Sequence, residues 1–287
     1  MQHNAAVEPK LLLAATPIGN IGDASDRLKR ALEGADIIAA EDTRKAHTLM
    51  SNLDITFTAK VISYFDGNEQ DRVPFLIDAL REGKSVVVIS DAGMPTVSDP
   101  GYRIAHAATA AGIPFSVLPG PSAVTTALAL SGLPSDRFSF EGFLPRKQGE
   151  RLHFLNDLAT ERRTMIFFEA PHRIVDTVAD LISVFGENRP AAMCREITKT
   201  YEEVTRGTLA DIQARCEREV LGEITLVISG LTEVVEMTDE AIAETVSTLI
   251  EQGVDRKAAI AEVVSRYGIP KRRVFDVMVA VKKSSTN

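Results

Sequence analysis

Short apolar runs that alternate with helical patterns constrain the fold of this 287-residue chain more than any other feature. In the first half, these runs are rich in Val, Ile, Leu and Ala, and several intervening helical patterns stop at a glycine. The runs are Leu11–Ala15, Asp36–Ala40, Val61–Phe65, Val86–Ile89 and Phe115–Leu118. Repetition of strand, helix and strand predicts a parallel sheet with helices packed on its faces.

The pattern changes after residues 130–137, LSGLPSDR, which we interpret as a linker. Five more strand-like runs follow, and only two clear helical segments lie among them, so the second sheet is predicted to be mixed. These runs are Phe138–Phe143, Thr164–Glu169, Ala191–Ile197, Glu203–Thr208 and Ile224–Ser229.

Beyond Leu231 the pattern is purely helical, with segments at Asp239–Gln252 and Asp255–Tyr267 and a third that opens at Pro270. Two helices joined by a short Gly turn are typical of a helix-turn-helix. The sequence therefore predicts an α/β protein of three domains: residues 1–130 with a parallel sheet, residues 131–233 with a mixed sheet, and a small helical domain at residues 234–287.

Three loops rich in Gly, Pro and short acceptors follow strands of the predicted parallel sheet. They are TPIGNIGD at residues 16–23, SDAGMPTVSDPG at residues 90–101 and PGPSA at residues 119–123, where Ser122 is placed to cap a helix. Because ligands of open α/β sheets bind at the carboxyl ends of the strands, these loops predict one ligand-binding rim.

The rim favours a cationic ligand over a polyphosphate. Neither G-x-x-x-x-G-K-[ST] nor G-x-G-x-x-G occurs in the chain. The rim and its surroundings instead carry Asp23, Asp42, Asp91 and Asp99. Carboxylates suit ribose hydroxyls and positive charge, and S-adenosylmethionine offers both.

Composition and charge limit the kinds of partner that this chain is expected to bind. The net charge is −8, which argues against nucleic-acid binding over the whole surface, yet residues 255–287 carry eight Lys and Arg against three acids. The two cysteines lack metal-site spacing, and we expect neither a disulfide nor a bound metal. No run of eighteen apolar residues and no leader-like pattern is found, so a cytoplasmic protein without membrane contact is expected.

Several motifs resemble those of the ribosomal RNA small subunit methyltransferase I family, within the tetrapyrrole methylase superfamily. In order they are TPIGNIGD, AEDTR (40–44), SDAGMPTVSDPG, PGPSA, FFEAPHR (167–173), CREITKTYEE (194–203) and GEITLVI (222–228). The resemblance covers residues 11–281. It implies an S-adenosylmethionine-dependent enzyme that methylates the ribose 2′-hydroxyl of a cytidine in the decoding region of 16S rRNA, and a homodimer.

The same resemblance implies that the methyl donor lies in a trough between the two α/β domains. The positions carried over as cofactor-binding are Pro17, Asp91, Gly93, Met94, Ser122, Ala123 and Phe168. Methyl transfer is an in-line displacement that depends on positioning and needs no metal.

A base that accepts the proton of a ribose hydroxyl helps such a transfer. The candidates near the motifs are Glu41, Asp42, Asp99, Glu169 and His172, and the sequence does not choose among them. Contacts to rRNA are expected from polar and cationic residues around the trough and in the tail: Arg44, Lys45, Asn68, Glu69, Arg146, Lys147, Arg173, Arg195, Lys199, Lys271, Arg272 and Arg273.

Two other interpretations remain open from the sequence. A precorrin-type carbon methyltransferase would bind a flat acidic macrocycle in the same trough. The motifs AEDTR and EAPHR and the basic tail argue against this interpretation. A non-catalytic RNA-binding protein of the same fold would not need the intact glycines and aspartates of the rim.

Overall fold

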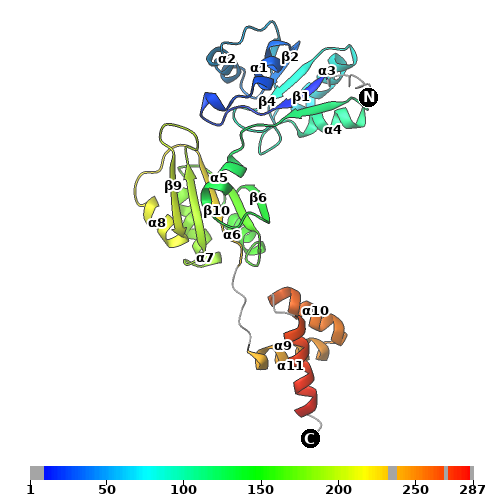
Figure 1. Ribbon diagram of the computed structural model, residues 1–287, viewed down its shortest axis with the longest axis vertical. Coiled ribbons are helices and arrows are strands. Elements are labelled where there is room, and N and C mark those ends of the chain that lie inside the picture. The colour runs from blue at the N-terminus through cyan, green and yellow to red at the C-terminus, as the bar shows by residue number, and fades with distance from the viewer. Residues whose placement is uncertain (1–9, 232–237, 268–270, 285–287) are drawn as a thin grey trace, which may run out of the picture. The chain divides into compact units, whose positions relative to one another are not determined.

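The computed structural model describes residues 10–231, 238–267 and 271–284. The chain divides into two compact units, Met1–Gly230 and Leu231–Asn287. The larger unit holds two five-stranded sheets and the smaller one is helical (Figure 1). The α/β fold class with one parallel and one mixed sheet is confirmed.

The first sheet has the strand order β3-β2-β4-β1-β5, and all its neighbours are parallel. Its central strand β4 is Val86–Ile89, and every residue of it is buried because helices cover both faces. The other strands are β1 (Leu11–Ala14), β2 (Ile37–Ala40), β3 (Lys60–Ser63) and β5 (Phe115–Leu118). The helices are η1 (Ile21–Asp23), α1 (Asp26–Glu33), α2 (Thr43–Asn52), α3 (Glu69–Arg81) and α4 (Tyr102–Ala110).

The second sheet has the order β6-β7-β10-β8-β9, with β6 and β7 parallel and the remaining pairs antiparallel. Its strands are β6 (Phe138–Phe143), β7 (Thr164–Glu169), β8 (Pro190–Arg195), β9 (Glu203–Thr208) and β10 (Ile224–Ile228). The helices α6 (Gln148–Asp157), α7 (Ile174–Phe185) and α8 (Leu209–Cys216) belong to it. Cys194 and Cys216 are buried free thiols.

Helix α5 (Ala123–Ser131) follows β5 of the first sheet but packs on the second. Val124, Ala127 and Leu128 are buried in one cluster with Ile166 of β7 and Val227 of β10. The packing boundary between the two sheets therefore lies before α5, whereas the predicted linker at residues 130–137 lies after it. The division into domains that end at residues 130 and 233 stays a prediction, and its second boundary lies outside the described residues.

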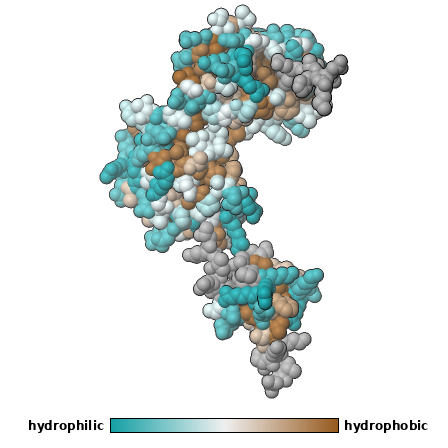
Figure 2. All heavy atoms as spheres, viewed as in Figure 1, coloured by the Kyte–Doolittle hydropathy of each residue, from teal (hydrophilic) through white to brown (hydrophobic). Residues whose placement is uncertain are grey.

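The smaller unit consists of α9 (Asp239–Glu251), α10 (Arg256–Tyr267) and α11 (Lys271–Ser284). Ile242, Val246, Val263, Val274 and Met278 form its buried core. The predicted turn with Pro270 lies outside the described residues. Figure 2 shows hydrophilic residues over much of the visible face of each unit. No described helix has the length and apolar character needed to cross a membrane.

Candidate functional site

Two loops of the predicted rim are joined where they leave the first sheet. Thr16 and Gly93 exchange backbone hydrogen bonds of 2.9 and 3.1 Å, and the Thr16 hydroxyl donates to the carbonyl oxygen of Ser90. These bonds hold the segment after β1 against the segment after β4. The rim is therefore a fixed structure, as the carboxyl ends of parallel strands allow.

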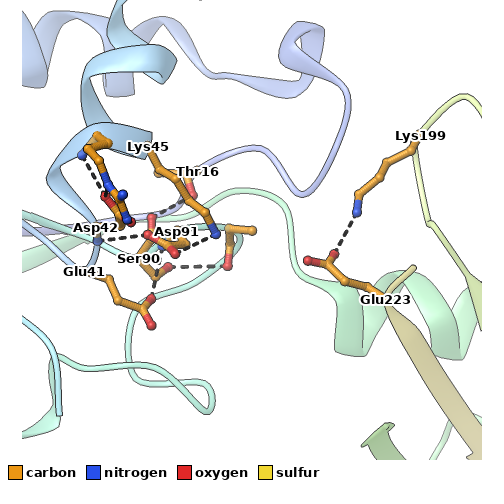
Figure 3. Close-up of polar contacts among 10 residues, drawn as sticks. Thr16, Glu41, Asp42, Lys45, Ser90, Asp91, Lys199 and Glu223 are labelled. Atoms are coloured by element: carbon orange, nitrogen blue, oxygen red, sulfur yellow. Dashed lines mark hydrogen bonds and ion pairs between the residues drawn. The ribbon is translucent and has the colours of Figure 1, made fainter. Parts of the chain in front are cut away.

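Asp91 connects the loop after β4 to the segment where β2 ends and α2 begins. One oxygen of its carboxylate accepts a hydrogen bond from the backbone N–H of Asp42 at 3.0 Å, and the other lies 2.8 Å from the ammonium group of Lys45. The N–H of Asp91 in turn donates to the carboxylate of Glu41 at 3.3 Å (Figure 3). Asp91 is thus held by the β2–α2 connection, and its hydrogen bond with Lys45 raises the pKa of that ammonium.

Glu41, Asp91 and Asp99 form an acid cluster on one side of a pocket. Burial raises the pKa of Glu41, although the hydrogen bond from the Asp91 N–H opposes the shift. Burial, together with the charge of Glu41, raises the pKa of Asp99 to about 7, against the opposing hydrogen bond from Ser90. Carboxylates close to one another favour a cationic ligand or a shared proton.

Residues of the second sheet form the opposite wall of the pocket. Phe143 comes from β6, and Phe168 and Glu169 come from β7. Glu223 directly precedes β10, and residues 224–225 are its first two residues. The Glu223 carboxylate binds Lys199 at 3.0 Å, across the pocket from Lys45 and Asp91 (Figure 3). The pocket has a volume of about 280 Å³.

The two walls touch where the loop after β1 meets the loop after β8. The N–H of Asn20 donates to the Thr198 hydroxyl at 3.0 Å. Gly19 lies so close that a Cβ there would be 2.5 Å from Cγ of Lys199 and 3.0 Å from the carbonyl oxygen of Ile197. Glu196 and Thr198 have φ of 51° and 66°, a strained backbone for residues with side chains. Both sheets therefore fix the width of the pocket.

The structure brings most of the predicted cofactor residues together. Asp91, Gly93, Met94, Ser122, Ala123 and Phe168 all line the pocket, and Pro17 does not. Ser122 stands at the N-cap of α5, but its hydroxyl makes no capping hydrogen bond, contrary to the sequence-based expectation. These assignments stay proposals; what the structure shows is that the residues share one cavity.

The five acid–base candidates have different surroundings. Glu41, Asp99 and Glu169 line the pocket, whereas Asp42 and His172 do not. Asp42 caps α2 and binds Arg44 at 2.7 Å, and this hydrogen bond holds the pKa of its carboxyl well below its usual range. Glu169 is buried and accepts hydrogen bonds from the Thr177 hydroxyl and the Ala170 N–H, both at 2.7 Å. His172 is exposed.

Two predicted rRNA contacts have structural roles within the first sheet. Glu69 is buried, where it accepts hydrogen bonds from the Tyr64 hydroxyl and the Gly101 N–H, both at 2.7 Å. Asn68 closes the turn before α3: its side chain accepts from the N–H of Phe65 and donates to the carbonyl oxygen of Ser63. Glu69 is therefore withdrawn from solvent, whereas Asn68 is half-buried and its contact with RNA stays a prediction.

The predicted cations of the second sheet are mostly paired with acids. Arg173 donates to carbonyl oxygens of the β6–α6 turn and lies 3.3 Å from Glu169, and Arg195 pairs with Glu203. Burial lowers the pKa of Lys199, but its hydrogen bonds to Glu196 and Glu223 outweigh this effect and raise the pKa overall. Arg173 and Lys199 thus pair with Glu169 and Glu223, two acids that line the pocket, whereas Arg195 pairs with an acid that does not line it.

Other predicted cations are exposed. Lys45 lines the pocket, and Arg44 precedes it on the first turn of α2. Arg146 and Lys147 lie on the turn after β6. In the smaller unit, Lys271, Arg272 and Arg273 are exposed on the first turn of α11, with Arg273 bound to Asp239 at 3.1 Å. Their contact with RNA stays a prediction.

Sequence reasoning did not single out several residues that line the pocket. Ile18, Val97, Ser98, Glu223 and Thr225 lie within the quoted motifs, whereas Phe143 lies outside them at the end of β6. For Ile18, Val97 and Ser98, the position in loops that follow strands was the available signal. Among the residues that the structure describes, no group of His, Cys, Asp and Glu is arranged to hold a metal ion.

Known proteins share this architecture and sequence. The family of Tetrapyrrole (Corrin/Porphyrin) Methylases matches residues 10–213. The ribosomal RNA small subunit methyltransferase I of Mycobacterium bovis is 45% identical over 277 residues, which is 96% of either chain. A relative of the same name from Halalkalibacterium halodurans is 42% identical over 274 residues, 93% of either chain.

Among solved structures, the uroporphyrin-III C-methyltransferase from Thermus thermophilus, in complex with S-adenyl homocysteine, is similar to this chain with a TM-score of 0.53. The match has 17% identity and covers 76% of this chain and 96% of that chain. At this identity the likeness supports the fold, which agrees with the two sheets described above.

Proposed function

Because the chain belongs to the ribosomal RNA small subunit methyltransferase I family of the tetrapyrrole methylases, we propose that it transfers a methyl group from S-adenosylmethionine to 16S rRNA. The proposed acceptor is the 2′-hydroxyl of a cytidine ribose in the decoding region. The observation that carries the proposal is the pocket shared by six predicted cofactor positions and the acid cluster.

The residues present fit a sulfonium cofactor. The acid cluster supplies negative charge, and Ile18, Val97 and Phe168 supply apolar surface for a flat heterocycle and a methyl group. When bound, the sulfonium supplies an electrophilic methyl group. The contribution of the protein is to orient donor and acceptor and to keep water away from the reacting atoms.

Asp99 is the group we assign as the proton acceptor. It lines the pocket, and a carboxyl with a pKa of about 7 holds and releases a proton near neutral pH. Burial, and after it the charge of Glu41, raises the pKa of Asp99. The Glu41 carboxylate itself accepts the hydrogen bond of the Asp91 N–H. The Glu169 carboxylate accepts hydrogen bonds from Thr177 and Ala170. We therefore assign Glu169 a role in fixing the structure of the pocket wall rather than in proton transfer.

Exposed cations would hold the phosphates of the RNA. Arg44, Arg146 and Lys147 lie on the larger unit, and Lys271, Arg272 and Arg273 lie on α11 of the smaller one. Because the acid cluster repels phosphate, we expect the pocket itself to receive only the ribose. A homodimer in the cytoplasm remains part of the proposal, and sedimentation of the full chain tests its oligomeric state.

The test is methyl transfer to small ribosomal subunits that lack the modification. Labelled S-adenosylmethionine is supplied, and the labelled nucleotide is mapped in 16S rRNA. Label on one cytidine ribose is expected. Label on a nucleobase would correct the acceptor, label on a precorrin but not on subunits would favour a tetrapyrrole enzyme, and cofactor-independent RNA binding without transfer would favour the non-catalytic alternative.

A further inference from the structure

An exposed phenyl ring stands at the edge of the pocket. Phe143, the last residue of β6, is 56% exposed and lines the cavity. Its ring packs edge-on against Phe168, with 5.6 Å between ring centroids, and Phe168 packs in turn against Phe140 at 4.8 Å. Phe143 thus packs against Phe168, while much of its surface stays exposed to solvent.

A β-bulge places this ring on the pocket side. Phe140 is in register with Ile166 and Phe143 with Phe168, so three steps along β6 match two along β7. Side chains alternate between faces along a strand, and without the extra residue Phe143 would point to the opposite face from Phe140. Gly142, with φ of 69°, takes the left-handed conformation that the bulge requires.

Two cationic residues come shortly after Phe143 in the sequence. Arg146 and Lys147 lie in the turn between β6 and α6, and both are exposed. Within the described part of the chain, Lys147 pairs with the exposed Glu150, and the Arg146 guanidinium makes no ion pair. A flat apolar surface beside cations is the combination that holds an unpaired nucleotide, because the base stacks and its phosphate is neutralised.

We propose that Phe143 is the stacking platform for an unpaired base of the RNA substrate, with Arg146 and Lys147 receiving the adjoining phosphates. This inference rests on the proposed function, because it takes the substrate to be RNA. Phe143 then sets how the nucleotide enters the pocket, while the acid cluster on the opposite wall faces the ribose.

Phe143 can be probed directly because the protein has no tryptophan. In Phe143→Trp the introduced indole is the single tryptophan, and stacking on a base quenches its emission. A protein-free RNA hairpin with unpaired cytidines is the probe, and quenching is expected with RNA. Quenching by S-adenosylhomocysteine alone, or none with RNA, would overturn the inference.

Kinetics supply the second test. Phe143→Ala is expected to raise KM for unmodified small subunits about 5- to 150-fold with cofactor affinity unchanged, and Phe143→Tyr to restore most of the loss. Phe138→Ala is the matched control: Phe138 lies on the same strand, is 40% exposed and does not line the pocket. Its KM should equal that of the unsubstituted protein.

The outcomes separate the two proposals. Transfer by the unsubstituted protein with equal KM for Phe143→Ala and Phe138→Ala would overturn the stacking role and leave the proposed function standing. Weaker cofactor binding in Phe143→Ala would reassign the ring to the cofactor. Absence of transfer by the unsubstituted protein would reject the proposed function, and the fluorescence titration with RNA would still decide whether the ring binds a base.

Discussion

The Asp91 carboxylate accepts a hydrogen bond from the backbone N–H of Asp42 at 3.0 Å, which ties the end of β4 to the start of α2. The same carboxylate is proposed to bind the cofactor. Asp91 therefore has a structural role and a proposed binding role, and substitutions separate them.

Asp91→Asn keeps an oxygen for the Asp42 N–H but removes the charge. We expect a melting temperature close to that of the unsubstituted protein and cofactor binding weaker by about 1.5–3 kcal/mol, measured by titration calorimetry. Asp91→Ala should weaken cofactor binding as well and also lower the free energy of unfolding by about 1–3 kcal/mol, because the Asp42 N–H is left without its acceptor. Unchanged affinity in both variants would reject Asp91 as a cofactor ligand.

Asp99 should give the reaction a pH dependence near neutrality. Since its carboxyl has a raised pKa of about 7, the base form accumulates as pH rises through that value. The rate of transfer is expected to rise over the same interval, and Asp99→Asn to lower kcat and abolish the ascending limb. A full ascending limb in Asp99→Asn would show that another group is the base.

As pH rises, the free energy of unfolding should change in the opposite direction to the rate of transfer. A carboxyl whose pKa is raised by folding from the usual 3.8 to about 7 binds more protons in the folded state between these values. The free energy of unfolding therefore falls as pH rises from about 4 to 7. Melting curves across this range should show the fall in the unsubstituted protein and a smaller one in Asp99→Asn.

Gly19 should tolerate no side chain. In Gly19→Ala the new Cβ meets the backbone of Ile197 and the side chain of Lys199, so the loops must separate. We expect a loss of about 1–3 kcal/mol in the free energy of unfolding and weaker cofactor binding. Gly149→Ala, where nothing lies within 4 Å of the new Cβ at the start of α6, is the control and should be neutral or slightly stabilising. Equal effects of the two changes would show that the neighbours of Gly19 move aside to accommodate a Cβ.

The cations of α11 should change the salt dependence of RNA binding. Substitution of Lys271, Arg272 and Arg273 by Ala is expected to weaken binding to small subunits and to reduce the log–log salt slope by about 0.7–0.9 for each phosphate that these side chains no longer neutralise. Cofactor affinity should not change. An unchanged slope, with a fall in activity that follows a lower melting temperature, would identify these residues as structural, a role that the Arg273–Asp239 pair could serve.

Local sequence patterns predicted the strands well because strands favour β-branched and aromatic residues. Val86–Ile89, Phe138–Phe143 and Thr164–Glu169 have the predicted bounds. Helix α8 was missed because it spans only Leu209–Cys216. Its capping box between Thr208 and Asp211 was the signal that could have revealed it.

Features that depend on tertiary packing could not be predicted from the sequence. Helix α5 is rich in apolar residues on all sides, so its sequence does not say which sheet it covers. The burial of Glu69 depends on Tyr64 and Gly101, which are brought to it by folding. The family resemblance is confirmed, whereas the choice of Asp99 among five acid–base candidates needed the surroundings of each group.

The order of the second sheet has a consequence for synthesis of the chain. The last strand to be made, β10, lies in the middle, between β7 and β8. During translation, the pairs β6–β7 and β8–β9 must therefore wait with exposed edges until residues 224–228 emerge. Since Glu223 and Thr225 also line the pocket, a nascent chain gains its complete ligand site only when this sheet closes.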